Sequence, residues 1–153
     1  GVPRPKAQYW LATSTTDVTL ERVDAQSIKV RPSGGFLSNP ADLLFRDPRK
    51  PLRIDQQINL GPLTIKVIEV TADARPAQIL AHFSLPLEHP SLLWLRWSDI
   101  AYVPFVPPAF GRCVVLPAAD YFLIVLGRRL PFFDRFIRRT PAWSICPRLG
   151  VAG

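Results

Sequence analysis

The sequence contains no methionine and, among its 153 residues, only two cysteines and two histidines. Cys113 and Cys146 are too few and too far apart for a disulfide scaffold or for a zinc site built from Cys and His. One bridge between them and two free thiols are both compatible with the chain, so the sequence leaves their redox state open. Since no metal-ligand or cofactor motif is present, we expect no metal and no cofactor.

The sequence also lacks a hydrophobic run long enough to cross a membrane. A spanning helix needs about 18 or more apolar residues, whereas the run from Cys113 to Leu126 has 14 and includes Pro117 and Asp120. No signal peptide is visible at the N-terminus. The missing initial methionine predicts that the chain begins after processing or is a piece of something longer, and proline-rich residues 1–8 are expected to be a linker.

Long helices are disfavoured because 17 prolines are scattered along the chain. A hydrophobic content of 48% excludes wholesale disorder, and 153 residues suffice for one domain with a sizeable core. Short alternating runs separated by turn residues favour strands. We predict an all-β fold, a small antiparallel β-sandwich or barrel of about seven or eight strands over residues 9–118, followed by a basic apolar tail over 119–153.

The clearest element is a hairpin over residues 63–85, with Asp73-Ala74-Arg75-Pro76 as its turn. Its second arm alternates apolar and polar residues, which indicates a strand with one buried face. Its first arm changes parity near Ile68-Glu69, which predicts either a β-bulge or a strand buried on both sides. Ala74 is unusual in a tight turn, where Gly or Asn ordinarily supplies a positive φ.

The length of that turn determines the register of the hairpin. A three-residue loop from Ala74 to Pro76 would place Ile65 opposite Leu85 and Val67 opposite Phe83. A second hairpin and four further strands are expected around it. They are 17–22 with 26–31, and then 52–60, 92–97, 100–105 and 112–116.

No spacing of residues predicts a catalytic site. His82, on the polar face of its strand, and His89, in a loop, are expected to be ordinary residues of those positions. Neither forms a nucleophile–base–orienter pattern with its neighbours Ser84 and Glu88. Ser33-Gly34-Gly35 lacks the glycine spacing of a phosphate-binding loop and predicts a turn. We assign no catalytic residue, and the balance favours a protein that is not an enzyme.

A cluster of aromatic residues spans two predicted strands. These residues suit a β-core, an interface that a Trp meets with its exposed edge, or, alternating with Arg96, a platform on which bases or sugars stack. The core is the favoured interpretation and the interface the second. They are Trp94, Trp97, Tyr102 and Phe105.

A basic loop precedes the predicted strand over residues 52–60. Its Arg46 and Arg49 resemble the Arg-rich segment before a strand in cyclic-dinucleotide-binding PilZ barrels, although the second half of that signature, Asp/Asn-x-Ser-x-x-Gly, is absent. The alternative function is therefore a nucleotide- or nucleic-acid-binding β-barrel. Its site would comprise Trp94, Arg96, Trp97, Arg46 and Arg49.

The net charge of +7 is concentrated in the tail, where residues 121–153 hold six Arg and one Asp. Residues 131–139 predict a short C-terminal amphipathic helix with an aromatic face and a basic face. Such a helix suits an anionic membrane surface, a membrane-protein partner, or docking onto the β-domain itself. Nucleic acid is less favoured, because five surplus charges give a modest electrostatic footprint. The expected contact residues are Phe132, Phe133, Arg135, Phe136, Arg138 and Arg139.

Four short motifs carry a resemblance to a known kind of domain. They are Gly34-Gly35-Phe36, Leu44-Phe45-Arg46, Asp73-Ala74-Arg75-Pro76 and Phe105-x-Pro107-Pro108-Ala109-x-Gly111. Over about residues 10–118 the chain resembles the C-terminal soluble β-domain of uncharacterised bacterial multi-pass membrane proteins. In that pattern the hairpin turn is DGRP, so the chain departs from it at Ala74. The resemblance implies no known activity, and the tail has no counterpart in it.

These observations lead to one expected function. Arg outnumbers Lys by 15 to 4, which is typical of GC-rich coding and agrees with a bacterial source. We expect a non-catalytic extramembrane β-domain of a bacterial membrane protein that serves assembly or protein interaction. It would be membrane-associated on a side that the sequence does not specify, or soluble if the chain is complete. The oligomeric state is left open.

Overall fold

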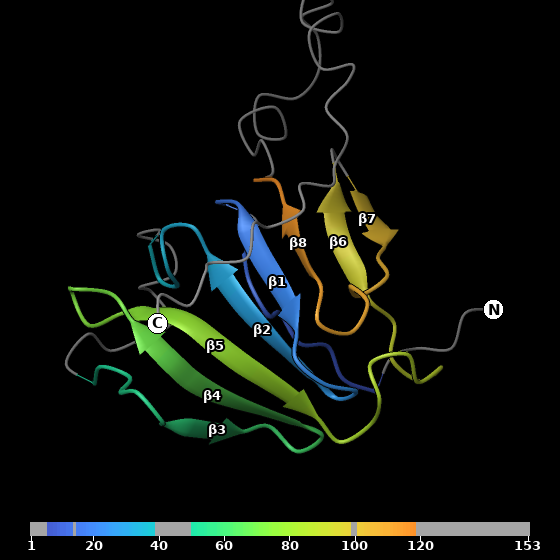
Figure 1. The fold of residues 1–153 in the computed structure, drawn as a ribbon, viewed down its shortest axis with the longest axis horizontal. Helices are drawn as coiled ribbons and strands as arrows, with labels where there is room; N and C mark the ends of the chain where they lie inside the picture. Colours follow the sequence, from blue (N-terminus) through green and yellow to red (C-terminus); the bar gives the residue numbers. More distant parts are fainter. Residues whose placement is uncertain (1–5, 14, 39–49, 99–100, 119–153) are drawn as a thin grey trace, which may run out of the picture.

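The computed structural model describes residues 6–13, 15–38, 50–98 and 101–118, and every structural statement below refers to these ranges. Within them the protein is all-β, with eight strands in two antiparallel sheets (Figure 1). The strands are β1 (Val18–Arg22), β2 (Ser27–Pro32), β3 (Gln57–Asn59), β4 (Leu63–Val70), β5 (Pro76–Phe83), β6 (Leu95–Ser98), β7 (Ala101–Pro104) and β8 (Cys113–Leu116).

The described strands confirm the predicted all-β class and form no closed barrel. The predicted C-terminal helix and the rest of the tail lie outside the described residues, as do Arg46 and Arg49. Two strands are shorter than predicted: the expected strand over 52–60 is reduced to β3, and the one expected over 92–97 begins only at Leu95.

Six strands form one antiparallel sheet in the order β3-β4-β5-β2-β1-β8. The β4–β5 hairpin adds to the β1–β2 hairpin through β5, which pairs with β2 so that Val30 lies opposite Ile79. The last strand, β8, returns to pair with β1. Both predicted hairpins are therefore present, and they meet in the middle of the sheet.

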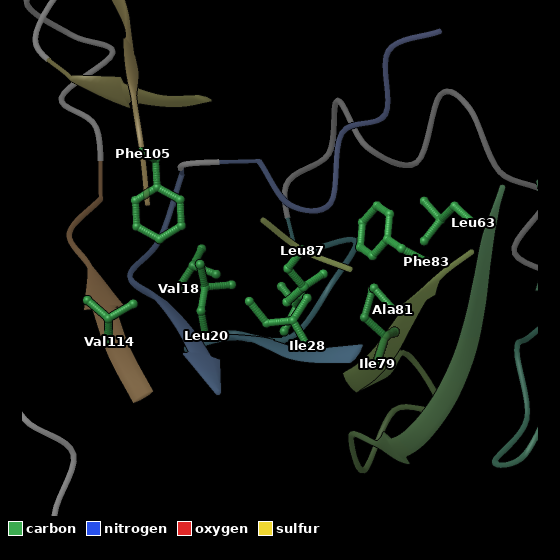
Figure 2. Close-up of a cluster of buried hydrophobic side chains, with 11 residues drawn as sticks. Val18, Leu20, Ile28, Leu63, Ile79, Ala81, Phe83, Leu87, Phe105 and Val114 are labelled. Atoms are coloured by element: carbon green, nitrogen blue, oxygen red, sulfur yellow. The ribbon is translucent and has the colours of Figure 1, made fainter. Parts of the chain in front are cut away.

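One face of this sheet is buried and forms the core. Alternate residues of β1, β2, β4, β5 and β8 point to this face, as the period of two along a strand requires (Figure 2). Loops, rather than a second large sheet, cover them: Leu87 is fully buried, Phe105 is buried, and Trp94 packs against the cluster. The sheet residues in the cluster are Val18, Leu20, Ile28, Val30, Leu63, Ile79, Ala81, Phe83 and Val114.

The opposite face of the sheet carries paired charges. Lys29 donates to Glu21 at 3.2 Å across the β1–β2 ladder. Arg31 pairs with Glu69 and also donates to the Gln78 side-chain oxygen at 3.2 Å. Because these side chains are partly exposed, their ion pairs each contribute little to stability. They mark this face as the solvated one.

The β4–β5 hairpin contains the predicted irregularity but not the predicted register. Val67 lies opposite Ile79 while Glu69 lies opposite Gln78, so Ile68 is the extra residue of a β-bulge. Ile65 pairs with Ala81 and Val67 with Ile79, instead of with Leu85 and Phe83. The predicted partners were wrong by four residues because the turn spans Thr71–Arg75, where Thr71 N donates to Arg75 O at 2.7 Å. Because the register differs from the predicted one by an even number of residues, the same side chains still face the core.

Two glycines of the sequence motifs, Gly35 and Gly111, lie in the connections at the strand ends. Gly35 adopts a φ of +71° and closes a turn by donating to Pro32 O at 3.0 Å, which confirms the predicted turn. Gly111 adopts a φ of +67° and donates to Arg22 O at 3.1 Å, where the chain enters β8. These glycines are needed for backbone geometry, since positive φ is costly for residues with a Cβ.

Candidate functional site

The β6–β7 hairpin carries an uncharged apolar strip on one of its faces. In the ladder Leu95 lies opposite Pro104 and Trp97 opposite Tyr102. Leu93 and Val106 extend the same face by one step at the open end of the hairpin, given the alternation of side chains. We call these six residues the hairpin strip: Leu93, Leu95, Trp97, Tyr102, Pro104 and Val106.

Five residues of the hairpin strip are exposed to solvent, and the sixth, Trp97, is half-buried. Leu93 and Val106 are 71% and 76% exposed, and Tyr102 is 52% exposed. The rings of Trp97 and Tyr102 pack edge to face, with centroids 4.8 Å apart and planes at 85°. Among the described residues, Phe110 and Trp10 are also large, apolar and strongly exposed, but they lie outside the hairpin.

The other face of the same segment anchors it to the core. The Trp94 indole nitrogen donates to Leu87 O at 2.7 Å, and its ring meets Phe83 edge-on with centroids 5.2 Å apart. Phe105 N donates to Trp94 O at 3.0 Å, which continues the β6–β7 ladder by one pair. The favoured interpretation of the aromatic cluster as core is therefore correct for Trp94 and Phe105, while Trp97 and Tyr102 face outward.

The residues of the predicted binding platform do not share one surface. Trp94 and Arg96 lie on the core-facing side of β6 by alternation, and Arg96 is half-buried. Trp97 lies on the opposite side, so Trp94 and Trp97 do not stack on one ligand. Arg46 and Arg49 lie outside the described residues. The predicted contact residues of the tail, Phe132, Phe133, Arg135, Phe136, Arg138 and Arg139, lie outside them as well.

The structure brings together three residues that the sequence did not connect: Asp24, Ser27 and His82. The Ser27 hydroxyl and His82 Nδ1 are 2.9 Å apart, because the β2–β5 register places these residues opposite each other. The pKa of Asp24 is lowered, chiefly by the Gln26 backbone N–H, and also by the Ser27 hydroxyl and the His82 charge. Only the strand order could have revealed this group.

This group does not have the arrangement of a nucleophilic triad. In such a triad the imidazole lies between the hydroxyl and the carboxylate, whereas here the hydroxyl of Ser27 lies between Asp24 and His82. Ser27 is also only 2% exposed, so a substrate could not reach its oxygen. The group fastens the β1–β2 turn to β5. His82 is exposed on its strand, as predicted, and His89 in its loop bonds with Ser91 Oγ at 2.7 Å.

Arg22 is a buried charged residue, and each buried nitrogen of its side chain has a hydrogen-bond partner. It forms a two-pronged ion pair with Glu88 and donates from Nε to Asp24 O at 3.0 Å. The bond with Glu88 raises the pKa of Arg22 and lowers the pKa of Glu88. This pair holds the loop that carries Leu87 into the core, so its role is structural.

Two hollows of the described surface do not add a chemical site. One, of about 130 Å³, lies beside Trp10 and Phe36. The other, of about 460 Å³, lies between the Ser33–Gly35 turn and the end of β4, where its charged lining groups Arg31 and Glu69 pair with each other. Within the described ranges no group of three or more His, Cys, Asp or Glu is placed to hold a metal ion.

Cys113 in β8 is half-buried and has no disulfide partner among the described residues, and Cys146 lies outside them. No helix in the described part of the chain is long and apolar enough to span a membrane. The chain matches no protein-family model, no curated protein and no solved structure. The fold and surface thus define an all-β domain whose most distinctive exposed feature is the hairpin strip.

Proposed function

We propose that the protein is a non-catalytic interaction domain, the extramembrane β-domain of a bacterial membrane protein, and that the hairpin strip is its docking surface. The observation that carries the proposal is the strip itself: six adjacent uncharged residues, including Trp97 and Tyr102, on the outward face of one hairpin. The placement in a membrane protein comes from the motif resemblance over residues 10–118.

The composition of the strip suits a protein interface. Interface cores are depleted of charge and enriched in Trp and Tyr, which combine a large apolar surface with a polar group. The strip gathers its exposed apolar residues side by side on one face, which distinguishes it from apolar residues scattered singly over a surface. Scattered apolar residues such as Ile54, which is 54% exposed in the loop before β3, carry no such meaning.

The strip is also held in place from behind. The hydrogen bond from Trp94 to Leu87 O and the buried Phe105 fix the base of the hairpin on the core. A surface fixed in this way loses little conformational entropy when it binds, which favours affinity.

The test is site-specific photo-crosslinking in bacterial cells. A benzoylphenylalanine at Leu95 is expected to give a discrete product with an integral membrane protein, identified by mass spectrometry, while the same probe at Ile54 gives none. The additional change Tyr102→Asp should abolish the product, because a charge in the strip cannot be desolvated cheaply. Equal labelling from Leu95 and Ile54, or a product that Tyr102→Asp leaves unchanged, would exclude the strip as the docking surface.

A further inference from the structure

The connection from β7 to β8 is rich in proline. Pro104 ends β7, and Pro107 and Pro108 follow it, so that Pro104 and Pro107 have the spacing of a PxxP motif. Residues 105–109 form neither helix nor strand. We call residues 104–109 the proline ridge. It continues the hairpin strip, to which Pro104 and Val106 both belong.

The residue types of the proline ridge favour the polyproline II conformation. A proline ring fixes φ at about −65°, and the residue before a proline is kept out of the helical region and in the extended one. Both rules act on Pro107, which precedes Pro108, and the second rule acts on Val106. None of residues 104–109 has a positive φ. The ridge therefore has the backbone angles of polyproline II where its prolines adjoin.

Burial along the proline ridge repeats every three residues, which is the period of a polyproline II helix. Phe105 is buried in the core cluster, and Pro108, three residues later, is half-buried. Val106 and Ala109, also three residues apart, are both exposed. A period of two would instead place Ala109 on the buried side with Phe105. The core thus holds one edge of the ridge, and Val106 and Ala109 form an edge that faces solvent.

The backbone of the proline ridge also presents hydrogen-bond acceptors. Within the described part of the chain, no hydrogen bond is accepted by the carbonyls of Val106, Pro107 and Pro108. Polyproline II makes no internal hydrogen bonds, so its carbonyls are directed outward. The ridge ends where Ala109 O accepts from Arg112 N at 2.9 Å. Carbonyls of this kind suit the donors of Trp and Tyr side chains.

We infer that the partner binds the proline ridge in a groove lined by aromatic side chains, whose Trp and Tyr donors bond to the ridge carbonyls. Aromatic grooves of this kind take proline rings, and a polyproline II segment loses little entropy on binding because it is already extended. The buried Phe105 fixes the ridge further. This inference rests on the proposed function, because it names the chemistry of the partner that meets the hairpin strip at Pro104 and Val106.

The experiment uses the purified full-length chain with benzoylphenylalanine at Leu95, which lies opposite Pro104, irradiated with isolated bacterial membranes. Octaproline at millimolar concentration should lower the yield of the membrane-protein product, because it occupies the same groove, whereas a Gly-Ser peptide of equal length should not. Pro107→Val keeps an apolar side chain but removes the ring, and should lower the yield about tenfold. The matched control Pro51→Val, at an exposed proline before β3, should leave the yield unchanged.

Thermal unfolding of each variant shows whether the β-domain is still folded, and the octaproline arm needs no variant at all. A product that octaproline or a folded Pro107→Val chain leaves unchanged overturns the inference, as does an equal loss with the Gly-Ser peptide or with Pro51→Val. If Tyr102→Asp still abolishes that product, the proposed function stands. Absence of any product from the parent chain overturns the inference and the proposed function together.

Discussion

The guanidinium of Arg75 donates a hydrogen bond of 2.9 Å to the backbone carbonyl of Phe36, thirty-nine residues earlier in the chain. It also donates to Gly34 O at 3.2 Å, and Phe36 N in turn donates to Pro76 O at 2.7 Å. A Cβ at Gly35 would lie only 2.9 Å from the Thr71 methyl carbon, so glycine permits this close approach. Two of the motifs behind the sequence resemblance thus form one joint between the end of β2 and the β4–β5 turn.

Removing the Arg75 side chain should loosen this joint. Arg75→Ala leaves the Gly34 and Phe36 carbonyls without their charged donor and is expected to lower the free energy of unfolding by about 1–3 kcal/mol. Chemical denaturation measures the change. Arg53→Ala, at an exposed site before β3, is the matched control and should stay within about 0.5 kcal/mol of the parent. Equal effects of the two substitutions would contradict a role for Arg75 at the joint.

The turn of the main hairpin should be stabilised by glycine. Ala74 has a φ of +60°, a conformation that costs a residue with a Cβ about 1–2 kcal/mol. Ala74→Gly removes this cost but makes the unfolded chain more flexible, so a net gain of about 0.5–1 kcal/mol is expected from the denaturation midpoint. Ala72→Gly, two residues earlier and without a positive φ, should give no gain. A loss of stability in Ala74→Gly would show that the strain at this position is relieved in another way.

Stability should depend on acid through Asp73. The Arg75 side chain, followed by the Thr71 hydroxyl, lowers the pKa of Asp73 from 3.8 to about 2. Since the folded pKa is depressed, the stabilising contribution is present above pH 3.8 and is lost as the pH falls through 2. The difference in unfolding free energy between the parent and Asp73→Asn should therefore shrink across this window.

An NMR titration of the Asp73 carboxyl checks the cause of that dependence. In Arg75→Ala its pKa should move back toward 3.8, because the largest source of the shift is gone. A titration that is the same in the parent and in Arg75→Ala would rule out this explanation.

The covering loop should matter as much as the sheet. Leu87 belongs to the loop that the Arg22–Glu88 pair holds against the sheet, and its side chain is fully buried. Leu87→Ala is expected to cost about 2–5 kcal/mol, from lost burial and the cavity left behind. Ile54→Ala, which removes a largely exposed side chain, should cost less than about 0.5 kcal/mol. Thermal unfolding of the two variants provides the comparison, and similar melting temperatures would mean that the loop does not complete the core.

The strands were predictable because their signal is local. Alternation along β5 shows which residues face inward, and the change of parity at Ile68 predicts either a bulge or a strand buried on both sides, of which the register of β4 with β5 selects the bulge. The unusual alanine at position 74 likewise marked the turn where the backbone is strained. These features depend on the steric limits of a few neighbouring residues, and such limits are written in the sequence.

The candidate site was not predictable in the same way. Apart from Arg96, every residue of the segment 92–97 is apolar or aromatic, and the face that carries Arg96 is the one that packs inward, so a period of two does not show which face is buried. Trp94 faces the core because its indole reaches Leu87 O, a partner that is set by the fold. Trp97 is left on the outward face as a result, and the exposed strip follows from that choice.

The sequence by itself determined the all-β class, the two hairpins, the turns and the place where the first arm of the main hairpin is irregular, because alternation, proline and glycine act over a few residues. Only the tertiary structure decided the strand order, the register of β4 with β5, the meeting of Ser27 with His82, and the outward face of the β6–β7 hairpin. Each of these depends on contacts between residues far apart in the chain, where loops and buried partners choose among arrangements that the local pattern allows equally.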